Sequence, residues 1–191
     1  MYAFLLSFGV IFVAELGDKS QLMALTLATR YRPWPILAGI TVATAGVHAV
    51  SVLVGAAMGR TIPTDWITLI AGIAFLGFAA WTLRGDELTA ADEESASRAR
   101  RSAFVTALVV FFLAELGDKT MLATITLATR EGLFGTWLGS TVGMVAADAL
   151  AIALGAVLGK RLPERAVRVG AAFLFVLFGV LLIIEALREL L

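Results

Sequence analysis

The sequence predicts an all-α integral membrane protein with six transmembrane helices, arranged as two inverted three-helix repeats. Hydrophobic residues make up 60% of the 191 positions, and the mean hydropathy is +0.92. A soluble domain is only about 45–50% apolar. The apolar residues fall into stretches of about 20, which is the length that a helix needs to cross a bilayer. The segment that begins at residue 14 also returns almost unchanged one hundred residues later.

Six apolar segments are long enough to span the membrane. They are residues 3–28, 36–59, 65–84, 103–128, 134–159 and 165–187. The first segment has no basic region before it and no small-residue cleavage site, so we expect a retained helix and not a signal peptide. Residues 85–102 form a polar linker, acidic first and basic last. We therefore predict a first repeat at 1–84, a linker at 85–102 and a second repeat at 103–191.

The orientation follows from the inverted repeat and from the loop charges. Because each repeat has three spans, the second repeat enters the membrane in the opposite sense to the first. One side then carries ten Lys and Arg residues: Arg30, Arg32, Arg84, Arg98, Arg100, Arg101, Lys160, Arg161, Arg165 and Arg168. The other carries three: Arg60, Arg130 and Arg188. Because basic loops stay in the cytoplasm, the linker is expected inside and both termini outside.

Composition excludes several classes of function. The formal net charge is zero, so no basic surface points to nucleic acid as a partner. There is no cysteine, which rules out disulfides and thiolate metal ligands. The expected surroundings are the lipid bilayer, and a homo-oligomer is left open.

The repeated segment is rich in charge. Residues 14–30 read AELGDKSQLMALTLATR and residues 114–130 read AELGDKTMLATITLATR, with twelve of seventeen positions identical. Ionisable groups at membrane depth cost about 2.5–3.5 kcal/mol each on insertion scales, so they are usually kept for function. A duplicated cluster of this kind indicates one site built from two halves.

Four acidic residues lead this cluster. Glu15 and Glu115 fall near the middle of their spans. Asp18 and Asp118 follow three residues later, which predicts that each acidic pair shares a helix face. A glycine lies between the acids of each pair, at 17 and 117, and glycine allows a helix to unwind locally and expose carbonyl oxygens.

These residue types suit a hard divalent cation. The predicted metal ligands are Glu15, Asp18, Glu115 and Asp118, with neutral oxygens nearby from Ser20, Gln21 and Thr120. Carboxylate, hydroxyl and carbonyl oxygens bind Ca²⁺, Mg²⁺ and Mn²⁺. Lys19 and Lys119 offset part of the charge and leave about −2, which a divalent ion would neutralise. Without the ion some acids would take up protons, so metal and protons compete for the same groups.

A structural alternative is a pair of buried ion pairs within helices, Glu15 with Lys19 and Glu115 with Lys119. This reading leaves the two aspartates unexplained. Buried ion pairs are also weak stabilisers, so the binding reading is favoured.

A second corresponding pair lies in the spans that follow. His48 and Asp148 are one hundred residues apart and at equivalent depth. They are candidates for a proton relay or an outer ligand, and an imidazole would favour Mn²⁺ over Ca²⁺. The alternative for His48 is a hydrogen bond to a backbone carbonyl. Met23 and Met121 could be soft ligands, but packing is the expected role.

The doubled E-L-G-D-K-[ST] resembles the signature of the Golgi and bacterial calcium/manganese cation–proton antiporter family, which carries E-x-G-D-[KR]-[ST] twice. Its bacterial members resemble manganese exporters of the MneA type. The resemblance implies that Glu15, Asp18, Glu115 and Asp118 bind the ion, and that Lys19, Ser20, Lys119 and Thr120 complete the two motifs. It also implies export of Mn²⁺ or Ca²⁺ in exchange for protons. The chain lacks the long N-terminal targeting region of eukaryotic relatives, which favours the plasma (inner) membrane of a prokaryote.

The functional hypothesis is therefore a secondary transporter and not an enzyme, with the transported divalent cation in place of any cofactor. A divalent-cation channel and a small-solute exporter, for example of amino acids, remain alternatives. An intramembrane metalloenzyme is disfavoured because the chain has no H-E-x-x-H, no G-x-S-x-G and no other nucleophile–base arrangement. The order of Mn²⁺ and Ca²⁺, the proton stoichiometry and the role of the linker stay open.

Overall fold

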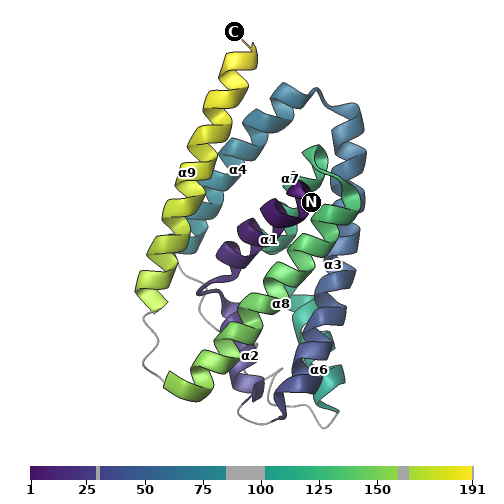
Figure 1. Cartoon of the computed structure of the whole chain (residues 1–191), viewed down its shortest axis with the longest axis vertical. Helices are drawn as coiled ribbons and strands as arrows, with labels where there is room; N and C mark the ends of the chain where they lie inside the picture. The colour runs from purple at the N-terminus through teal and green to yellow at the C-terminus, as the bar shows by residue number, and fades with distance from the viewer. Residues whose placement is uncertain (29–30, 85–101, 159–163, 191) are drawn as a thin grey trace.

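The computed structural model describes residues 1–28, 31–84, 102–158 and 164–190, and in these residues it is all helical (Figure 1). The helices are α1 Tyr2–Glu15, α2 Lys19–Ala28, α3 Pro33–Thr61, α4 Thr64–Arg84, α6 Ala103–Glu115, α7 Lys119–Arg130, α8 Leu133–Leu158 and α9 Glu164–Leu190. The predicted all-α class is confirmed. The predicted linker 85–102 lies almost wholly outside the described residues.

Four of the described helices are long and apolar enough to cross a membrane. They are Pro33–Thr61, Asp65–Arg84, Leu133–Leu154 and Val169–Leu190. The stretches 3–28 and 103–128, which we expected to be single spans, are each divided into a shorter apolar helix (α1 or α6) and a second helix (α2 or α7). Each of these predicted spans is therefore interrupted within the repeated motif.

The principal helix contacts join the two halves of the sequence. Helix α3 packs against α6 and α7, α8 packs against α1 and α2, and α4 packs against α9. Glycines allow the closest approaches. A Cβ atom on Gly39 would lie 2.5 Å from the carbonyl oxygen of Phe104, and one on Gly139 would lie 2.3 Å from that of Phe4. The two glycines are one hundred residues apart in the sequence, and so are the two phenylalanines, so these two crossings are equivalent.

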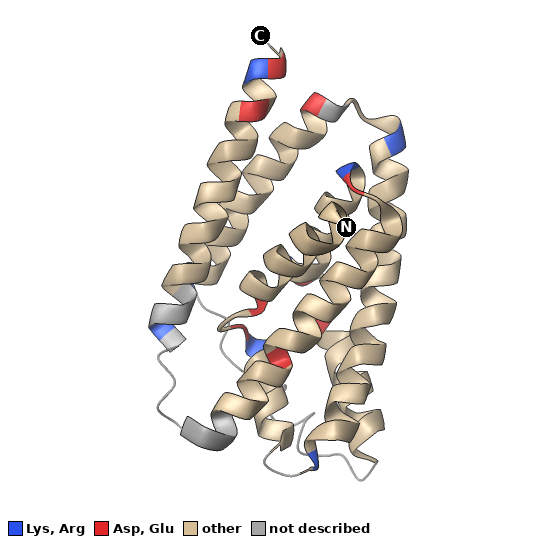
Figure 2. Cartoon of the chain, in the orientation of Figure 1, with Lys and Arg blue, Asp and Glu red and all other residues tan. Residues whose placement is uncertain are grey.

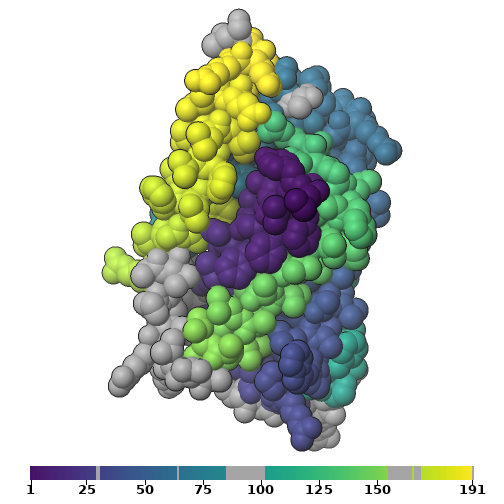
Figure 3. Space-filling view, viewed as in Figure 1, coloured from purple at the N-terminus to yellow at the C-terminus, as the bar shows by residue number. Residues whose placement is uncertain are grey.

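Apolar residues surround the two interrupted helices. One buried cluster joins α1, α4, α7, α8 and α9, and a second joins α2, α3, α6 and α8. Within the first cluster, edge-on contacts among Phe75, Phe78 and Phe175 hold α4 to α9. In the space-filling view, α1 fills the face between α9 and α8 (Figure 3). The acidic ends of both interruptions therefore lie in an apolar interior, whereas Leu116 and Gly117 between α6 and α7 are exposed.

Candidate cation site

Two interrupted helices supply the candidate site. Helix α1 ends at Glu15 and α2 begins at Lys19, while α6 ends at Glu115 and α7 begins at Lys119. Between them, Gly17 has φ 76° and Gly117 has φ 81°. Residues with a Cβ atom rarely adopt this left-handed conformation. The expected unwinding at the two glycines is confirmed.

The geometry of each acidic pair differs from the expectation. The backbone leaves the helical region at Leu16 and Leu116, which have ψ values of 119° and 111°. Each glutamate is therefore the last residue of one helix, and each aspartate precedes the next. The prediction that the two acids share one helix face is wrong, because the helix does not continue between them.

All the acids of the motif are buried. The exposed fraction is 0% for Glu15, 1% for Asp18, 1% for Glu115 and 4% for Asp118. Figure 2 shows acidic segments in the middle of a helical body that is otherwise largely uncharged. Because buried charges need a partner, the contacts of these carboxylates decide what the site can do.

In the first half, side chains bridge the interruption. The Ser20 hydroxyl donates to a Glu15 carboxylate oxygen and also approaches Asp18 Oδ2 at 2.9 Å. The Gly17 amide donates to Gln21 Oε1 at 2.9 Å, and Gln21 Nε2 donates to the Ala147 carbonyl of α8 at 3.1 Å. Gln21, predicted as an oxygen donor to the cation, holds the unwound turn against α8 in this conformation.

In the second half the corresponding positions form different bonds. The Thr120 hydroxyl donates to Glu115 Oε2 at 2.7 Å, and the Gly117 amide approaches Met121 Sδ at 3.2 Å. Met121 thus occupies the place of Gln21 and provides only a weak acceptor. Met23, by contrast, packs in the second apolar cluster, as expected.

Charged groups from the two halves meet. Lys119 forms an ion pair with Asp18, across the two halves of the sequence. Glu15 interacts electrostatically with Glu115, and Asp148 of α8 interacts with both glutamates. The structure thus gathers the acids into one region. The ion pair between the halves is not the within-helix pairing that the structural alternative required.

Several of these oxygens have unused bonding capacity. Glu15 Oε2, Glu115 Oε1 and both carboxylate oxygens of Asp148 are buried and have no hydrogen-bond partner in the described part of the chain. Unsatisfied buried oxygens are uncommon and require an explanation such as a proton, water or an ion. However, no three Asp, Glu or His side chains in the described ranges stand in an arrangement that could hold a metal ion. The metal site remains a prediction.

His48 and Asp148 are not equivalent in their surroundings. Both are fully buried. Helices α3 and α8 meet one turn earlier, where the Thr44 hydroxyl lies 3.4 Å from Met144 Sδ. Neither ring nitrogen of His48 has a hydrogen-bond partner among the described residues. The alternative of a hydrogen bond from His48 to a backbone carbonyl is therefore wrong for this conformation, whereas Asp148 belongs to the acidic region.

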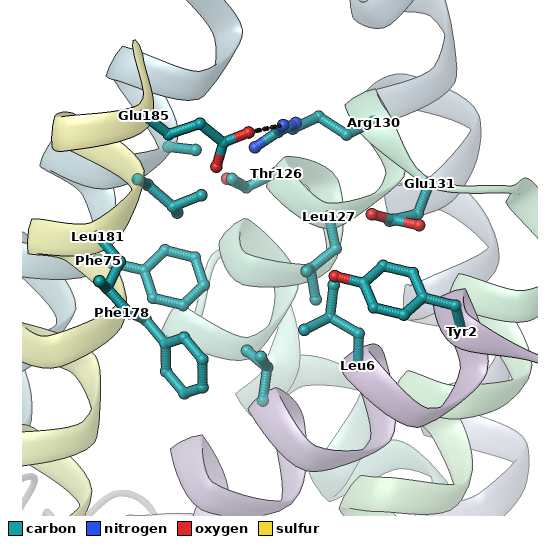
Figure 4. A pocket seen from close by; sticks show the side chains of 13 residues that line it. Tyr2, Leu6, Phe75, Thr126, Leu127, Arg130, Glu131, Phe178, Leu181 and Glu185 are labelled. Carbon is teal, nitrogen blue, oxygen red and sulfur yellow. Dashed lines mark hydrogen bonds and ion pairs between the residues drawn. The ribbon is translucent and has the colours of Figure 1, made fainter. Parts of the chain in front are cut away.

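A cavity of about 270 Å³ lies between α1, α4, α7 and α9 (Figure 4). Its lining is mainly apolar, with an ion pair at one edge between Arg130 and Glu185, at 2.8 Å. Sequence reasoning did not connect these two residues, because they are far apart in the chain and lie on α7 and α9. None of the motif acids lines this cavity, so it is separate from the candidate cation site.

A helical membrane protein with buried acids gathered from two interrupted helices has the features of an ion-coupled secondary transporter. The chain belongs to the family described as divalent cation/proton antiporter GDT1, whose model matches residues 3–90 and again residues 103–190.

Curated relatives agree with this assignment. The chain is 36% identical to the "Putative manganese exporter" of Vibrio cholerae, over 91% of this chain and 86% of that protein. It is 32% identical to the GDT1-like protein sll0615 of Synechocystis, over 90% and 91%. It is 34% identical to the chloroplastic GDT1-like protein 2 of rice, over 93% of this chain and 59% of the relative. No solved structure matches the chain.

Proposed function

We propose that this protein exports a divalent cation from the cytoplasm in exchange for protons, with Mn²⁺ as the first candidate and Ca²⁺ as the second. The observation that carries the proposal is the meeting of buried acids from both halves, several with unsatisfied oxygens. The family and the name of the Vibrio relative support the choice of cation. The family is one of transporters, and no catalytic role is proposed.

The proposed topology has six crossings in two inverted repeats, with α1–α2 and α6–α7 each forming one interrupted span. The equivalent glycine crossings at Gly39 and Gly139 support a symmetric pair of repeats. The excess of basic residues on one side favours a cytoplasmic linker and outward termini. We place the protein in the inner membrane of a prokaryote.

In the proposed mechanism, Glu15, Asp18, Glu115 and Asp118 bind the cation from the cytoplasm. The hydroxyls of Ser20 and Thr120 orient the glutamates, as they do in this structure. The repeats then move so that the site opens outward and the ion leaves. Protons neutralise the carboxylates for the return, because the return of several uncompensated charges through a low-dielectric interior is costly.

The test is flux in proteoliposomes that contain Mn²⁺ and carry an imposed pH gradient. We expect saturable Mn²⁺ movement that follows the gradient and is abolished by Glu15→Gln and by Asp118→Asn. Gly77→Ala is the matched control, because a Cβ atom there would meet nothing within 4 Å. Flux that ignores the gradient and survives both acidic substitutions would overturn the proposal, and flux that does not saturate would favour a channel.

Measurements of cation binding to the purified protein test the preference between Mn²⁺ and Ca²⁺ and the direction in which pH changes the affinity. Calorimetric titrations with Mn²⁺ and Ca²⁺ are expected to show tighter binding of Mn²⁺. Because protonated carboxylates are poor ligands, the affinity for either ion should fall as the pH falls. An affinity that is independent of pH would contradict the competition between metal and protons.

A further inference from the structure

The two motif lysines occupy different environments although their neighbours in sequence are nearly identical. Lys119 is buried, with 2% of its side chain exposed, and forms the ion pair with Asp18. Lys19 is only half-buried, and it forms no ion pair within the described ranges of the chain. The two lysines therefore depart from the symmetry of the repeat.

The Lys119 ammonium group lies where it can act as a counter-ion to the buried acids. Besides its partner Asp18, it interacts electrostatically with Glu15 and Asp118. A positive charge among three buried acids lowers the cost of keeping them in a low-dielectric interior. It also explains why the described acids do not form a metal-binding group here, since an ammonium group and a metal ion cannot occupy the same place.

We propose that Lys119 acts as a tethered cation that fills the site when no metal is bound, and that the incoming metal ion displaces it. Lys19 takes the equivalent place beside Asp118 when the protein faces the other side of the membrane. The inference rests on the proposed function, because it needs a transported cation. The inference goes further than the proposed function because the two lysines alternate between a buried and a half-buried position during transport, and neither is a fixed structural partner.

Repeat symmetry supports the second part of the proposal. In a transporter built from inverted repeats, the two halves exchange conformations as access alternates. The contacts of Gly39 and Gly139 show that one pair of crossings, α3 with α6 and α8 with α1, is equivalent in the two halves. A conformation with Lys119 buried and Lys19 half-buried therefore has a counterpart in which their positions are reversed.

The first test compares thermal unfolding of the purified full-length protein in a chelator and in saturating Mn²⁺. A displaceable lysine stabilises only the metal-free state, whereas a fixed ion pair stabilises both states. We therefore expect Lys119→Gln to lower the melting temperature in chelator, and to enlarge the stabilisation by Mn²⁺ relative to the native protein. Lys19→Gln, the matched control, should leave the metal-free melting temperature nearly unchanged.

Mn²⁺ affinity gives a second measurement. Removal of the competing charge in Lys119→Gln should tighten Mn²⁺ binding on the order of tenfold, the scale of one buried charge-assisted contact. Lys119→Arg should weaken binding, because a guanidinium group holds carboxylates with more donors than an ammonium group. This second variant keeps the charge, so it tests the proposal even if Lys119→Gln does not fold.

Thiol labelling tests the alternation, because the chain has no cysteine. In proteoliposomes without metal, Lys19→Cys should react faster than Lys119→Cys with a small thiol reagent in this conformation. A pH gradient that favours the opposite conformation should reverse the order. An unchanged order would overturn the alternation of the two lysines.

The outcomes separate this inference from the proposed function. If the native protein exchanges Mn²⁺ for protons but Lys119→Gln lowers the melting temperature equally with and without metal, the lysine is a fixed structural partner and only this inference fails. If the native protein neither binds nor moves a divalent cation, the proposed function fails and the inference fails with it.

Discussion

The two interrupted helices share a sequence but not a set of contacts. In the first half, Ser20 bonds to Glu15 and approaches Asp18, and Gln21 bridges the unwound turn to α8. In the second half, the hydroxyl of Thr120 bonds to Glu115, and the Gly117 amide meets the sulfur of Met121 in place of a glutamine oxygen. Gln21 thus gives the first interruption a hydrogen bond to α8 that the thioether of Met121 cannot donate.

One pair of helix crossings, α3 with α6 and α8 with α1, does not share this asymmetry. Gly39 and Gly139 make equivalent backbone contacts with Phe104 and Phe4, at similar distances. These two crossings are thus nearly equivalent, whereas α7 packs more extensively against α3 than α2 does against α8, and the polar contacts of the two halves also differ. This combination fits a carrier held in one of two related conformations, because the equivalent crossings can serve both, while the interrupted helices and the polar site distinguish them.

The largest effect is expected from the second corresponding pair, Asp148 and His48. Asp148 interacts with the acids of both halves, whereas His48 has no polar partner among the described residues. Asp148→Asn should therefore reduce Mn²⁺ affinity by about 10–100-fold, as removal of a group next to a metal commonly does. His48→Gln should have a much smaller effect on affinity.

Calorimetry on both variants, with Mn²⁺ as the ligand, measures the difference. Both substitutions keep the approximate size of the side chain, so folding is a fair control and can be followed by thermal unfolding. Equal losses of Mn²⁺ affinity in the two variants would mean that His48 and Asp148 contribute alike to binding. That result would contradict the different surroundings of the two residues in the structure.

An intermediate effect is expected from the glycine crossings, where the halves should behave alike. A Cβ atom on Gly39 or Gly139 would lie too close to a backbone oxygen, so the helices must separate. Gly39→Ala and Gly139→Ala should each lower the free energy of unfolding by about 1–3 kcal/mol. Gly77→Ala, with open space around it, should be neutral or slightly stabilising, by up to about 1 kcal/mol.

Denaturant unfolding in detergent compares the three variants. A large difference between Gly39→Ala and Gly139→Ala would show that these two crossings are as asymmetric as the site. The interpretation of equivalent crossings that serve two conformations would then have to be abandoned.

Much of this arrangement could be predicted from the sequence, for a physical reason. A doubled acidic motif in apolar sequence is costly unless its charges meet, so the repeat itself predicts the gathering of Glu15 and Glu115. The glycine between the acids predicts the unwinding, because few other residues adopt a positive φ. Hydropathy predicts the remaining helices, since each is long and apolar.

The rest depends on contacts that a repeated sequence cannot distinguish. The two motif lysines follow the same five residues, AELGD, and the sequence does not indicate that Lys119 and not Lys19 pairs across the halves. The pairing of Arg130 with Glu185 likewise depends on how α7 lies beside α9. The repeat could predict that the acids of the two halves meet, but it could not predict which individual side chains on different helices pair.

The smallest effect is expected at Gln21 and Met121, the corresponding positions that differ most in chemistry. Gln21→Met removes a bond to the Ala147 carbonyl and the acceptor for the Gly17 amide, so the free energy of unfolding should fall by about 1–2 kcal/mol. Met121→Gln should be close to neutral, because the bond of the Gly117 amide to sulfur is weak and exposed. The double exchange, measured by denaturant unfolding, should resemble Gln21→Met alone. A contrary result would be that Met121→Gln raises the free energy of unfolding as much as Gln21→Met lowers it. The two turns would then be interchangeable, and the stabilisation of the first turn would come from the glutamine side chain alone and not from its position beside α8.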